Sequence, residues 1–513
     1  MLSRVSSGAV QGIDAIRVVV ETHITTGLPH FSTVGLPDSA VRESKDRVVA
    51  AIKQSGMAYP YRRITVNLAP ANVRKVGTSF DLPIAVGILA ASAQLPSQSL
   101  EDTVLIGELS LNGTLRPVRG ALPIALAAQR QGARRLIVPR ENAKEAAMAR
   151  DIDVFGIPSL ASAVRFLQGR EGFRPFLHTA DQLLASEVEY PFDFADVKGQ
   201  DHAKRAIEVA AAGSHNLLLI GPPGSGKTML ARCVSSILPD FTLEEALETT
   251  KIHSVTGRIP PFKPLVTSRP YRAPHHTITE AGLIGGGRMP KPGEVSLAHN
   301  GVLFLDEMPE FKKHVLDLLR QPLEEGKVAL SRASRSLAYP ARFTLVAAMN
   351  PCPCGYFGDP SHECTCPPAR IQRYMSRISG PLLDRIDLHI EVPPVPYRTL
   401  ADGSGGESSG RIRDRVNQAR DRQLPRFSNH PGSFGNAHMT PRDLRRYCRM
   451  DDRAHDLLRN AIARLGLSAR AYDRILKVAR TIGDLAGREE INAEHVGEAI
   501  QYRSLDRGKW MDI

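Results

Sequence analysis

The sequence is poor in cysteine and has no long apolar run, and each shortage excludes a class of protein. Six cysteines in 513 residues do not make the disulfide framework of a small secreted domain. The longest apolar stretch, residues 82–95, is too short to cross a bilayer. Residues 1–10 lack the apolar core of a secretory signal. We therefore expect a cytoplasmic protein with no membrane partner.

The composition that is present is that of a globular chain with an excess of basic residues. Hydrophobic residues make up 42% and charged residues 23%, which argues against a disordered or fibrous chain. A chain of this length needs more than one hydrophobic core, so we expect two or three domains. The formal net charge of +12 favours a polyanionic partner such as nucleic acid. Charge alone does not decide this, because many basic proteins bind no DNA.

The pattern along the chain predicts three folded regions. Residues 1–170 alternate short β-branched runs with amphipathic stretches, which is typical of an α/β domain. The periodicity weakens over residues 171–190, which we interpret as a linker, and a second α/β region follows over residues 191–398. Residues 399–410 are rich in glycine and serine and predict a flexible connector, and residues 411–513 predict a small all-α domain. The predicted fold class is α/β with a helical C-terminal domain.

A phosphate-binding loop is the clearest motif in the sequence. It matches G-x-x-x-x-G-K-[ST] at every fixed position, and its residues are Gly221, Pro222, Pro223, Gly224, Ser225, Gly226, Lys227 and Thr228. An apolar strand precedes the motif and a helical pattern follows it, which disfavours a chance match by a Gly/Pro-rich turn. Backbone N–H groups would surround the phosphates of ATP, Lys227 would reach the β and γ oxygens, and Thr228 would offer a hydroxyl to Mg²⁺.

Two further strands end in polar residues that suit the same site. The apolar strand over residues 301–305 is followed by Asp306, expected to hold Mg²⁺ through water, and by Glu307, expected to orient or deprotonate the attacking water. The strand over residues 344–349 is followed by Asn350, which we interpret as a contact to the γ-phosphate or the lytic water. Adjacent carboxylates can also form a solvated turn, and Asn before Pro is a common turn former. The order of the three segments favours one parallel sheet and the functional interpretation.

These motifs, together with four longer stretches, resemble the magnesium-chelatase-like group of AAA+ ATPases. The stretches are YRAPHH (271–276), GVLFLDEMPEF (301–311), NPCPCG (350–355) and SGPLLDRID (379–387). The resemblance covers nearly the whole chain and, within the group, points to the competence-protein type. It implies an ATP-driven motor that forms a homo-oligomeric, hexameric ring. It also implies helicase or branch-migration activity on single-stranded or branched DNA, independent of sequence, during the uptake and integration of transforming DNA.

The resemblance also assigns two arginines and a hairpin. Arg385 corresponds to an arginine finger that enters the ATP site of the next subunit, and Arg470 to the sensor-2 arginine of the helical lid. Without the resemblance, an arginine in a charged helix is usually a solvated residue or a surface ion pair. Residues 327–341 resemble the pre-sensor hairpin, with Arg332 and Arg335 at its tip. Such a cationic tip can follow a phosphate backbone, and an ordinary charged β-turn is the alternative.

Four of the six cysteines are close together in the sequence. They form two C-x-C pairs: Cys352, Cys354, Cys364 and Cys366. Two such thiol pairs across a short loop can surround a tetrahedral Zn²⁺. Because C-x-C is less diagnostic than C-x-x-C, free loop thiols stay the alternative to a structural zinc site.

The first domain resembles the proteolytic domain of Lon. Ser79 falls at the position of the nucleophile, but Leu122 occupies the position of the activating lysine, and a serine without a base is inert at neutral pH. We expect an inactive domain that serves ring assembly or DNA contact. A DNA-remodelling motor is therefore the leading hypothesis. The alternatives are a motor subunit for metal insertion into a porphyrin, which leaves the first domain unexplained, and an ATP-dependent protease, which Leu122 disfavours.

Overall fold

The structure is a computed structural model of the 513-residue chain. It describes residues 1–185, 188–260, 262–287, 290–332, 335–359, 361–397, 399, 405–428 and 434–503. The chain forms two compact units: unit 1 comprises Met1–Ser186 and Ala246–Thr267, and unit 2 comprises Glu187–Glu245 and Ser268–Ile513. Both contain helices and sheets of the predicted α/β class, and the C-terminal part of unit 2 is helical.

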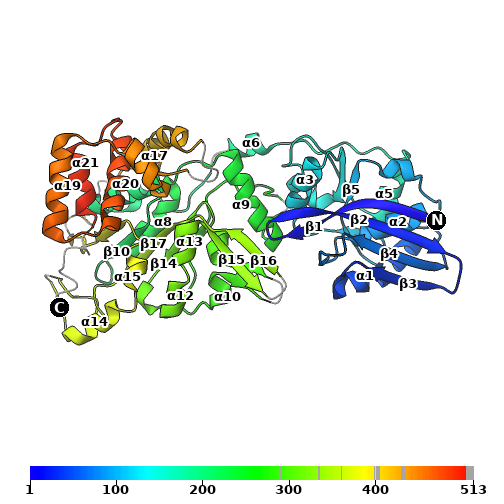
Figure 1. The fold of residues 1–513 in the computed structure, drawn as a ribbon, viewed down its shortest axis with the longest axis horizontal. Helices are drawn as coiled ribbons and strands as arrows, with labels where there is room; N and C mark the ends of the chain where they lie inside the picture. The colour runs from blue at the N-terminus through cyan, green and yellow to red at the C-terminus, as the bar shows by residue number, and fades with distance from the viewer. Residues whose placement is uncertain are drawn as a thin grey trace. The chain divides into compact units, whose positions relative to one another are not determined.

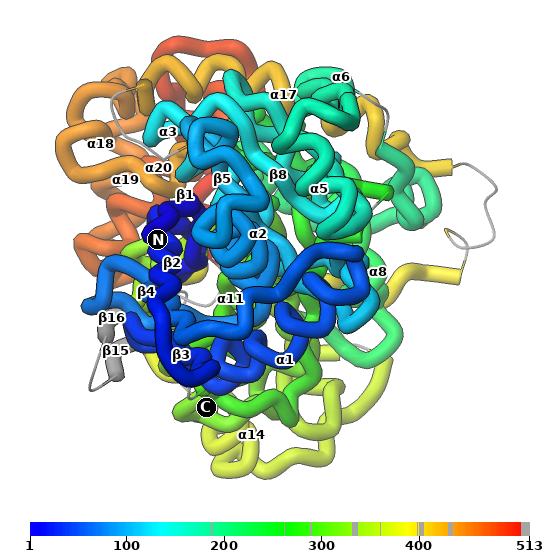
Figure 2. Tube along the Cα trace, turned by 90° about the vertical axis from the view of Figure 1, so that its right-hand side faces the viewer, coloured from blue at the N-terminus to red at the C-terminus, as the bar shows by residue number. Residues whose placement is uncertain are grey.

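A seven-stranded sheet forms the centre of unit 1, in the order β3-β4-β2-β1-β5-β8-β9. Its strands are β1 (Leu2–Gln11), β2 (Asp14–Thr25), β3 (His30–Val34), β4 (Arg63–Ala69), β5 (Thr103–Leu105), β8 (Arg135–Pro139) and β9 (Asp153–Ile157). Strand β2 is antiparallel to both of its neighbours, and the other neighbouring strands are parallel. Figure 2 shows β1, β2, β4 and β3 following one another, with α1 and α2 on one side of them.

Helices cover both faces of this sheet. Alternate residues of a strand point to opposite faces, and both faces carry apolar side chains that have to be buried. In β8, Ile137 belongs to one cluster of buried side chains and Leu136 to another. The first cluster includes α1 (Ser39–Gln54), α2 (Asp81–Ala91) and α5 (Leu160–Leu167), and the second includes α3 (Ala121–Arg130) and α4 (Ala143–Ala146). All residues of α2 are buried, so residues 82–91 of the longest apolar stretch lie in the core of unit 1. In the described part of the chain, no helix has the length and apolarity needed to cross a membrane.

Unit 2 is built on a parallel five-stranded sheet, in the order β11-β14-β17-β10-β18. The strands are β10 (Leu217–Ile220), β11 (Tyr271–Arg272), β14 (Val302–Leu305), β17 (Thr344–Met349) and β18 (Leu388–Glu391). One face packs against α7 (Asp201–Gly213), α8 (Lys227–Ile237) and the C-terminal helices, and the other against α11 (Glu294–Leu297), α12 (Lys313–Asp317), α14 (Pro368–Met375) and α15 (Gly380–Leu383). Figure 1 shows β10, β17 and β14 side by side.

The C-terminal helices share one hydrophobic core with the sheet of unit 2. They are α17 (Ser409–Gln423), α18 (Pro441–Tyr447), α19 (Asp452–Leu465), α20 (Ala469–Leu485) and α21 (Ala493–Gln501). Helices α17 and α20 pack against α7, and α19, α20 and α21 lie together in orange to red in Figure 1. Residues 400–404 of the predicted connector and residues 429–433 and 504–513 of the predicted helical domain lie outside the described residues.

Smaller elements complete the two units. They are α6 (Ala180–Leu184), α9 (Leu243–Thr256), α10 (Glu280–Leu283), α13 (Arg320–Glu325) and the pairs β6 (Glu108–Leu109) with β7 (Leu115–Arg116), β12 (Gly285–Gly286) with β13 (Lys291–Pro292), and β15 (Lys327–Arg332) with β16 (Arg335–Pro340). Strands β15 and β16 form the hairpin that the sequence suggests, with Val328 opposite Tyr339. Residues 333–334 at its turn lie outside the described residues.

Candidate nucleotide-binding site

The P-loop lies between a central strand and a helix of unit 2. It follows Ile220 at the carboxyl end of β10 and leads into α8, which begins at Lys227. Gly226 precedes this helix with φ +90°, a backbone conformation that glycine adopts without a steric penalty. The Lys227 ammonium donates to the carbonyl oxygens of Gly221 and Pro222, at 2.8 Å each. Burial lowers the pKa of Lys227, and the Asp306 carboxylate opposes this shift.

The two side chains that the sequence assigns to Mg²⁺ are in direct contact. Oγ1 of Thr228 donates to Oδ2 of Asp306 at 2.9 Å, although the residues are 78 positions apart. The other carboxylate oxygen of Asp306 accepts from the N–H of Glu307 at 3.0 Å. A hydroxyl and a carboxylate beside a phosphate-binding loop are oxygen ligands of the kind that Mg²⁺ prefers, so the residues present fit this ion.

Glu307 extends from the same strand end toward solvent. Its backbone has φ +50°, which is uncommon for a residue with a side chain, and its side chain is 63% exposed. Oε2 of Glu307 lies 3.9 Å from Nδ1 of His276, and the His276 ring packs against those of His275 and Phe311. The sequence stretch YRAPHH contains His276 but assigns it no role. The first two residues of this stretch form β11, which is parallel to β14. The residues that follow β11 therefore lie at the same edge of the sheet as Glu307, and this is how the sequence could have indicated His276.

Asn350 stands at this edge as well. Strand β17 lies between β14 and β10, and Met349, its last residue, pairs with Ile220, the last residue of β10. The N–H of Gly221 donates to the carbonyl of Met349 at 3.2 Å. The carboxyl ends of adjacent parallel strands therefore bring the P-loop, Asp306, Glu307 and Asn350 to one edge, where ligands bind in open α/β sheets.

The two arginines of the prediction lie at the opposite, amino edge. Leu388 pairs with Leu217, the first residue of β10, and Asn216 donates through its side-chain amide to the Arg385 carbonyl at 2.9 Å. The four-residue strand β10 separates the Arg385 backbone from the P-loop by about 13 Å at ~3.3 Å per residue. The Arg470 side chain also lies near this edge, since its Nη1 is 3.6 Å from Oδ2 of Asp384, the residue before Arg385.

The Arg385 side chain is largely held within its own chain. Its guanidinium pairs with the carboxylate of Glu324 and donates to the Pro381 carbonyl. Its Nε is buried and has no hydrogen-bond partner among the described residues. Arg470, by contrast, is 69% exposed. The structure thus brings the two arginines near each other and does not bring either to Lys227 of the same chain.

An open cavity of about 1240 Å³ adjoins the P-loop. Its walls come from the start of α7 and the residues before it, from the start of the P-loop, from the loop after β17 and from the chain around β18: they include residues 199–202, 220–222, 351, 357–359 and 391–396. A cavity of this size can accept the nucleoside part of a nucleotide whose phosphates lie on the P-loop.

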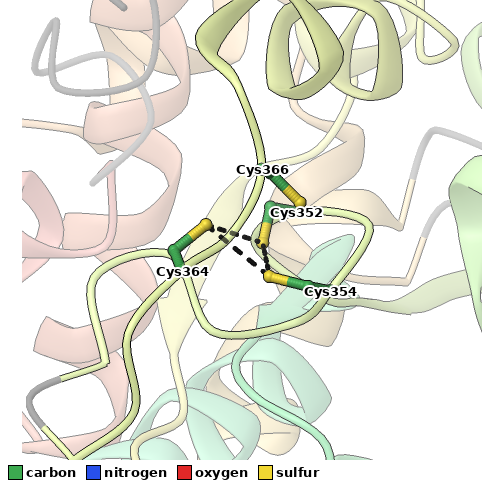
Figure 3. Close-up of side chains that lie close together, drawn as sticks. All are labelled: Cys352, Cys354, Cys364 and Cys366. Atoms are coloured by element: carbon green, nitrogen blue, oxygen red, sulfur yellow. Dashed lines mark hydrogen bonds between the residues drawn. The ribbon is translucent and has the colours of Figure 1, made fainter.

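Four thiols converge in the loop between β17 and α14 (Figure 3). The Sγ atoms of Cys352 and Cys354 are 3.3 Å apart, and that of Cys364 lies 3.7 and 3.6 Å from them. All four sulfurs, including that of Cys366, lie within 4.8 Å of one another. Tetrahedral Zn²⁺ with Zn–S bonds of ~2.3 Å places its sulfurs about 3.8 Å apart, whereas a disulfide needs ~2.05 Å. The set therefore fits zinc, and all four cysteines are free of disulfides.

The Lon-like positions of unit 1 have ordinary structural partners. Leu122 is buried, and its N–H donates to Oε1 of Glu145 at 3.1 Å. Lys75, the lysine nearest to Ser79 in the sequence, is buried and donates to the Pro70 carbonyl. The Leu122 side chain has no group that could act as a base, and the Lys75 ammonium is engaged by a backbone carbonyl.

Comparison with known proteins covers both units. The family described as "Magnesium chelatase, subunit ChlI" matches residues 193–400, "Subunit ChlI of Mg-chelatase" matches residues 20–142, and "Magnesium chelatase, subunit ChlI C-terminal" matches residues 406–503. The chain is 46% identical to Competence protein ComM of Haemophilus influenzae over 99% of its length and 98% of that protein. It is 44% identical to YifB of Escherichia coli, again over 99% and 98% of the two chains.

A more distant relative matches a smaller part of the chain. The magnesium-chelatase 38 kDa subunit of Cereibacter sphaeroides is 27% identical over 32% of this chain and 54% of its own length.

Proposed function

The chain belongs to the magnesium-chelatase-like family of AAA+ ATPases that includes Competence protein ComM and YifB, and we propose that it is a cytoplasmic, ATP-driven motor acting on DNA. The observation that carries the ATPase part is the contact between Thr228 and Asp306 beside the P-loop lysine. The DNA part goes beyond family membership and rests on charge, on one hairpin and on the relative from Haemophilus influenzae.

Each residue at the carboxyl edge has a proposed role in ATP hydrolysis. The loop from Gly221 to Gly226 binds the phosphates through its N–H groups, Lys227 stabilises the β and γ oxygens, and Thr228 and Asp306 hold Mg²⁺. When bound, Mg²⁺ supplies positive charge against the phosphate oxygens. Glu307 orients or deprotonates the attacking water, and Asn350 contacts the γ-phosphate or that water.

The position of the arginines supports a site shared between subunits. Because Arg385 and Arg470 lie at the amino edge, about the length of β10 away from the P-loop, we propose that they act on the ATP of a neighbouring subunit. The buried, unpartnered Nε of Arg385 supports a role for this side chain beyond its own ion pair. Such a head-to-tail contact closes into a ring, for which we propose six subunits.

Three observations support DNA as the substrate of the motor. The chain carries a net charge of +12. The hairpin of β15 and β16 pairs Arg332 with Arg335 next to its turn, and cationic hairpins can follow a phosphate backbone without reading sequence. The relative from Haemophilus influenzae is a competence protein. We propose helicase or branch-migration activity on recombination intermediates, in the integration of transforming DNA.

Strand displacement on forked and three-stranded DNA tests this function. We expect displacement with ATP and Mg²⁺, none with a non-hydrolysable analogue, and none by Lys227→Ala. ATP hydrolysis should also rise when DNA is added. Hydrolysis that is indifferent to DNA, together with no displacement on either substrate, would refute the motor.

A chelatase motor subunit is the second candidate, and the match to the magnesium-chelatase 38 kDa subunit favours it. That match covers only 32% of the chain, so it leaves most of the chain unaccounted for. In the same assay a chelatase subunit would hydrolyse ATP without displacing strands. An ATP-dependent protease is a weaker third candidate, and casein degradation that is unaffected by Ser79→Ala would remove it.

We also propose that the four thiols of Cys352, Cys354, Cys364 and Cys366 bind a structural Zn²⁺. The spacing of their sulfurs supports this assignment.

A further inference from the structure

We propose that zinc binding at the four cysteines holds the P-loop in its nucleotide-binding conformation, so that ATP affinity depends on zinc. The segment concerned, here called the Cys loop, is residues 351–367 between β17 and α14. The inference rests on the proposed ATPase function, and it adds a role for a metal that takes no part in the hydrolysis itself.

The Cys loop has little regular structure of its own. Its described residues contain neither helix nor strand. A loop of this length inside a compact domain needs an additional source of order. A metal held by both thiol pairs supplies it, because the bound ion joins two distant points of the loop and its binding free energy adds to the free energy of folding.

The loop begins at the catalytic edge of the sheet. Cys352 comes two residues after Asn350, and its side chain is fully buried. Cys354, the second thiol of this pair, lies next to Gly355 in the sequence. A metal on Cys352 and Cys354 therefore fixes the chain immediately beyond Asn350.

Gly355 connects the metal site to the P-loop. It has φ +90°, and a Cβ atom at this position would lie 2.5 Å from Cδ and 2.8 Å from Cγ of Pro223. The backbone of the Cys loop thus packs directly on the third residue of the P-loop, one position after a zinc-binding cysteine. Phe357, Gly358 and Asp359 then line the same cavity as the first residues of the P-loop.

Loss of the metal should loosen these contacts. Without the link between the two thiol pairs, Gly355 no longer presses against Pro223 and the wall formed by residues 357–359 becomes less ordered. The P-loop then has to be ordered when the nucleotide binds, which weakens binding because the free energy of ordering is subtracted from it.

The first experiment measures zinc and nucleotide affinity in the full-length chain. We expect about one zinc per chain by elemental analysis. Removal of the metal with 1,10-phenanthroline should weaken binding of a fluorescent ATP analogue at least about tenfold, and added Zn²⁺ but not extra Mg²⁺ should restore it. The double variant Cys364→Ser/Cys366→Ser should behave like the stripped protein. Cys448→Ser, at a buried thiol of the helical region beside Met439, should keep both zinc and affinity.

A second pair of variants separates the contact from the metal. Gly355→Ala should keep its zinc and still bind the analogue several-fold to tenfold more weakly, because its Cβ meets Pro223. Gly132→Ala is the control: Gly132 lies in unit 1 with φ +76°, and nothing lies within 4 Å of its Cβ, so the variant carries similar backbone strain without the clash. Thermal unfolding of each variant verifies that it is folded.

The outcomes decide between the proposals. A chain purified without zinc, stripped protein with unchanged affinity, or equal affinity of Gly355→Ala and Gly132→Ala would each overturn the zinc-dependent P-loop. A zinc-loaded chain that binds ATP in a zinc-dependent manner but displaces no strand would refute the DNA motor and support this inference. A zinc-loaded chain that binds no ATP would refute the ATPase on which both depend.

Discussion

The two edges of the five-stranded sheet in unit 2 are both rich in charged side chains, but they use them differently. At the carboxyl edge, Thr228 donates to Asp306, whose carboxylate opposes the lowering of the Lys227 pKa, and an open cavity adjoins the P-loop. At the amino edge, Asp387 is enclosed by partners: it accepts from the N–H of Asn216 at 3.0 Å and pairs with Arg474. Burial raises the pKa of Asp387, but Arg474 and the nearby His215 ring, whose Nδ1 lies 3.5 Å from Oδ2, outweigh this and hold the pKa well below its usual range.

The difference teaches how the site can be divided between subunits. The carboxyl edge offers ligands for phosphate and metal beside an open cavity, whereas the amino edge is an ion-pair network with Arg385 and Arg470 at its margin. Neither edge alone contains every group that the proposed hydrolysis uses. If the amino edge of one subunit meets the carboxyl edge of the next, each ATP site is complete only in the assembly.

Lys227→Ala removes the central cation of the carboxyl edge and should have the largest effect. We expect ATP binding to fall and steady-state hydrolysis to drop at least about 10²–10³-fold, since a lost charge contact to the transferring phosphate has this magnitude. Hydrolysis is measured by phosphate release. Lys313→Ala, on the exposed surface of α12, is the control and should behave like the wild type. Turnover of Lys227→Ala near the control rate would remove the assignment of this edge.

Glu307→Gln should separate binding from chemistry at the same edge. The amide keeps the size of the side chain but cannot accept a proton, so hydrolysis should fall about 10²–10³-fold while ATP still binds. Equilibrium binding of a fluorescent ATP analogue and size-exclusion chromatography with ATP test this, and an assembled, ATP-bound ring is the expected product. Normal turnover of this variant would contradict the role of Glu307.

Arg385→Ala tests the division of the site between subunits. It should lower hydrolysis by about 10²-fold or more and leave nucleotide binding by its own P-loop nearly intact. Mixing it with Lys227→Ala should restore part of the activity, because an intact P-loop then meets an intact arginine at some interfaces. Mixing Lys227→Ala with Glu307→Gln is the matched control: both changes lie at the carboxyl edge, so no recovery is expected. Equal behaviour of the two mixtures would contradict an arginine that acts on a neighbouring subunit.

The sequence predicted the carboxyl edge better than the amino edge, and the reason is physical. A P-loop and an acidic strand end are local motifs, since the strand, the turn and the helix that define them are contiguous. The contact between Thr228 and Asp306 follows once both strands are placed in one parallel sheet. Arg385 pairs with Glu324, which is 61 positions away in the sequence, and Arg470 lies beside Asp384, which follows a different helix. Only tertiary packing determines these partners.

Packing also determined other features that the sequence pattern did not indicate. Ala246–Thr267 joins unit 1 although it lies between motifs of unit 2, because membership in a core depends on which apolar faces meet and not on position in the chain. The contacts of Glu307 with His276 and of Gly355 with Pro223 are likewise tertiary. The predicted roles of Asn350, Arg385 and Arg470 in hydrolysis remain for the variants to test.

Glu324→Gln should have the smallest effect and addresses the amino edge alone. Glu324 is 56% exposed and pairs with Arg385 of its own chain. An ion pair with such an exposed partner contributes about 0–1 kcal/mol, so its loss should free Arg385 for the neighbouring site and raise hydrolysis by no more than about fivefold. The control is Glu325→Gln, which should leave the rate unchanged. The Glu325 carboxylate is adjacent and exposed, and it accepts a hydrogen bond from the side-chain amide of Gln321. A fall in hydrolysis specific to Glu324→Gln would show instead that this carboxylate holds Arg385 in the orientation that hydrolysis needs. The ion pair would then position the arginine for the neighbouring site and would not have to break before Arg385 can act there.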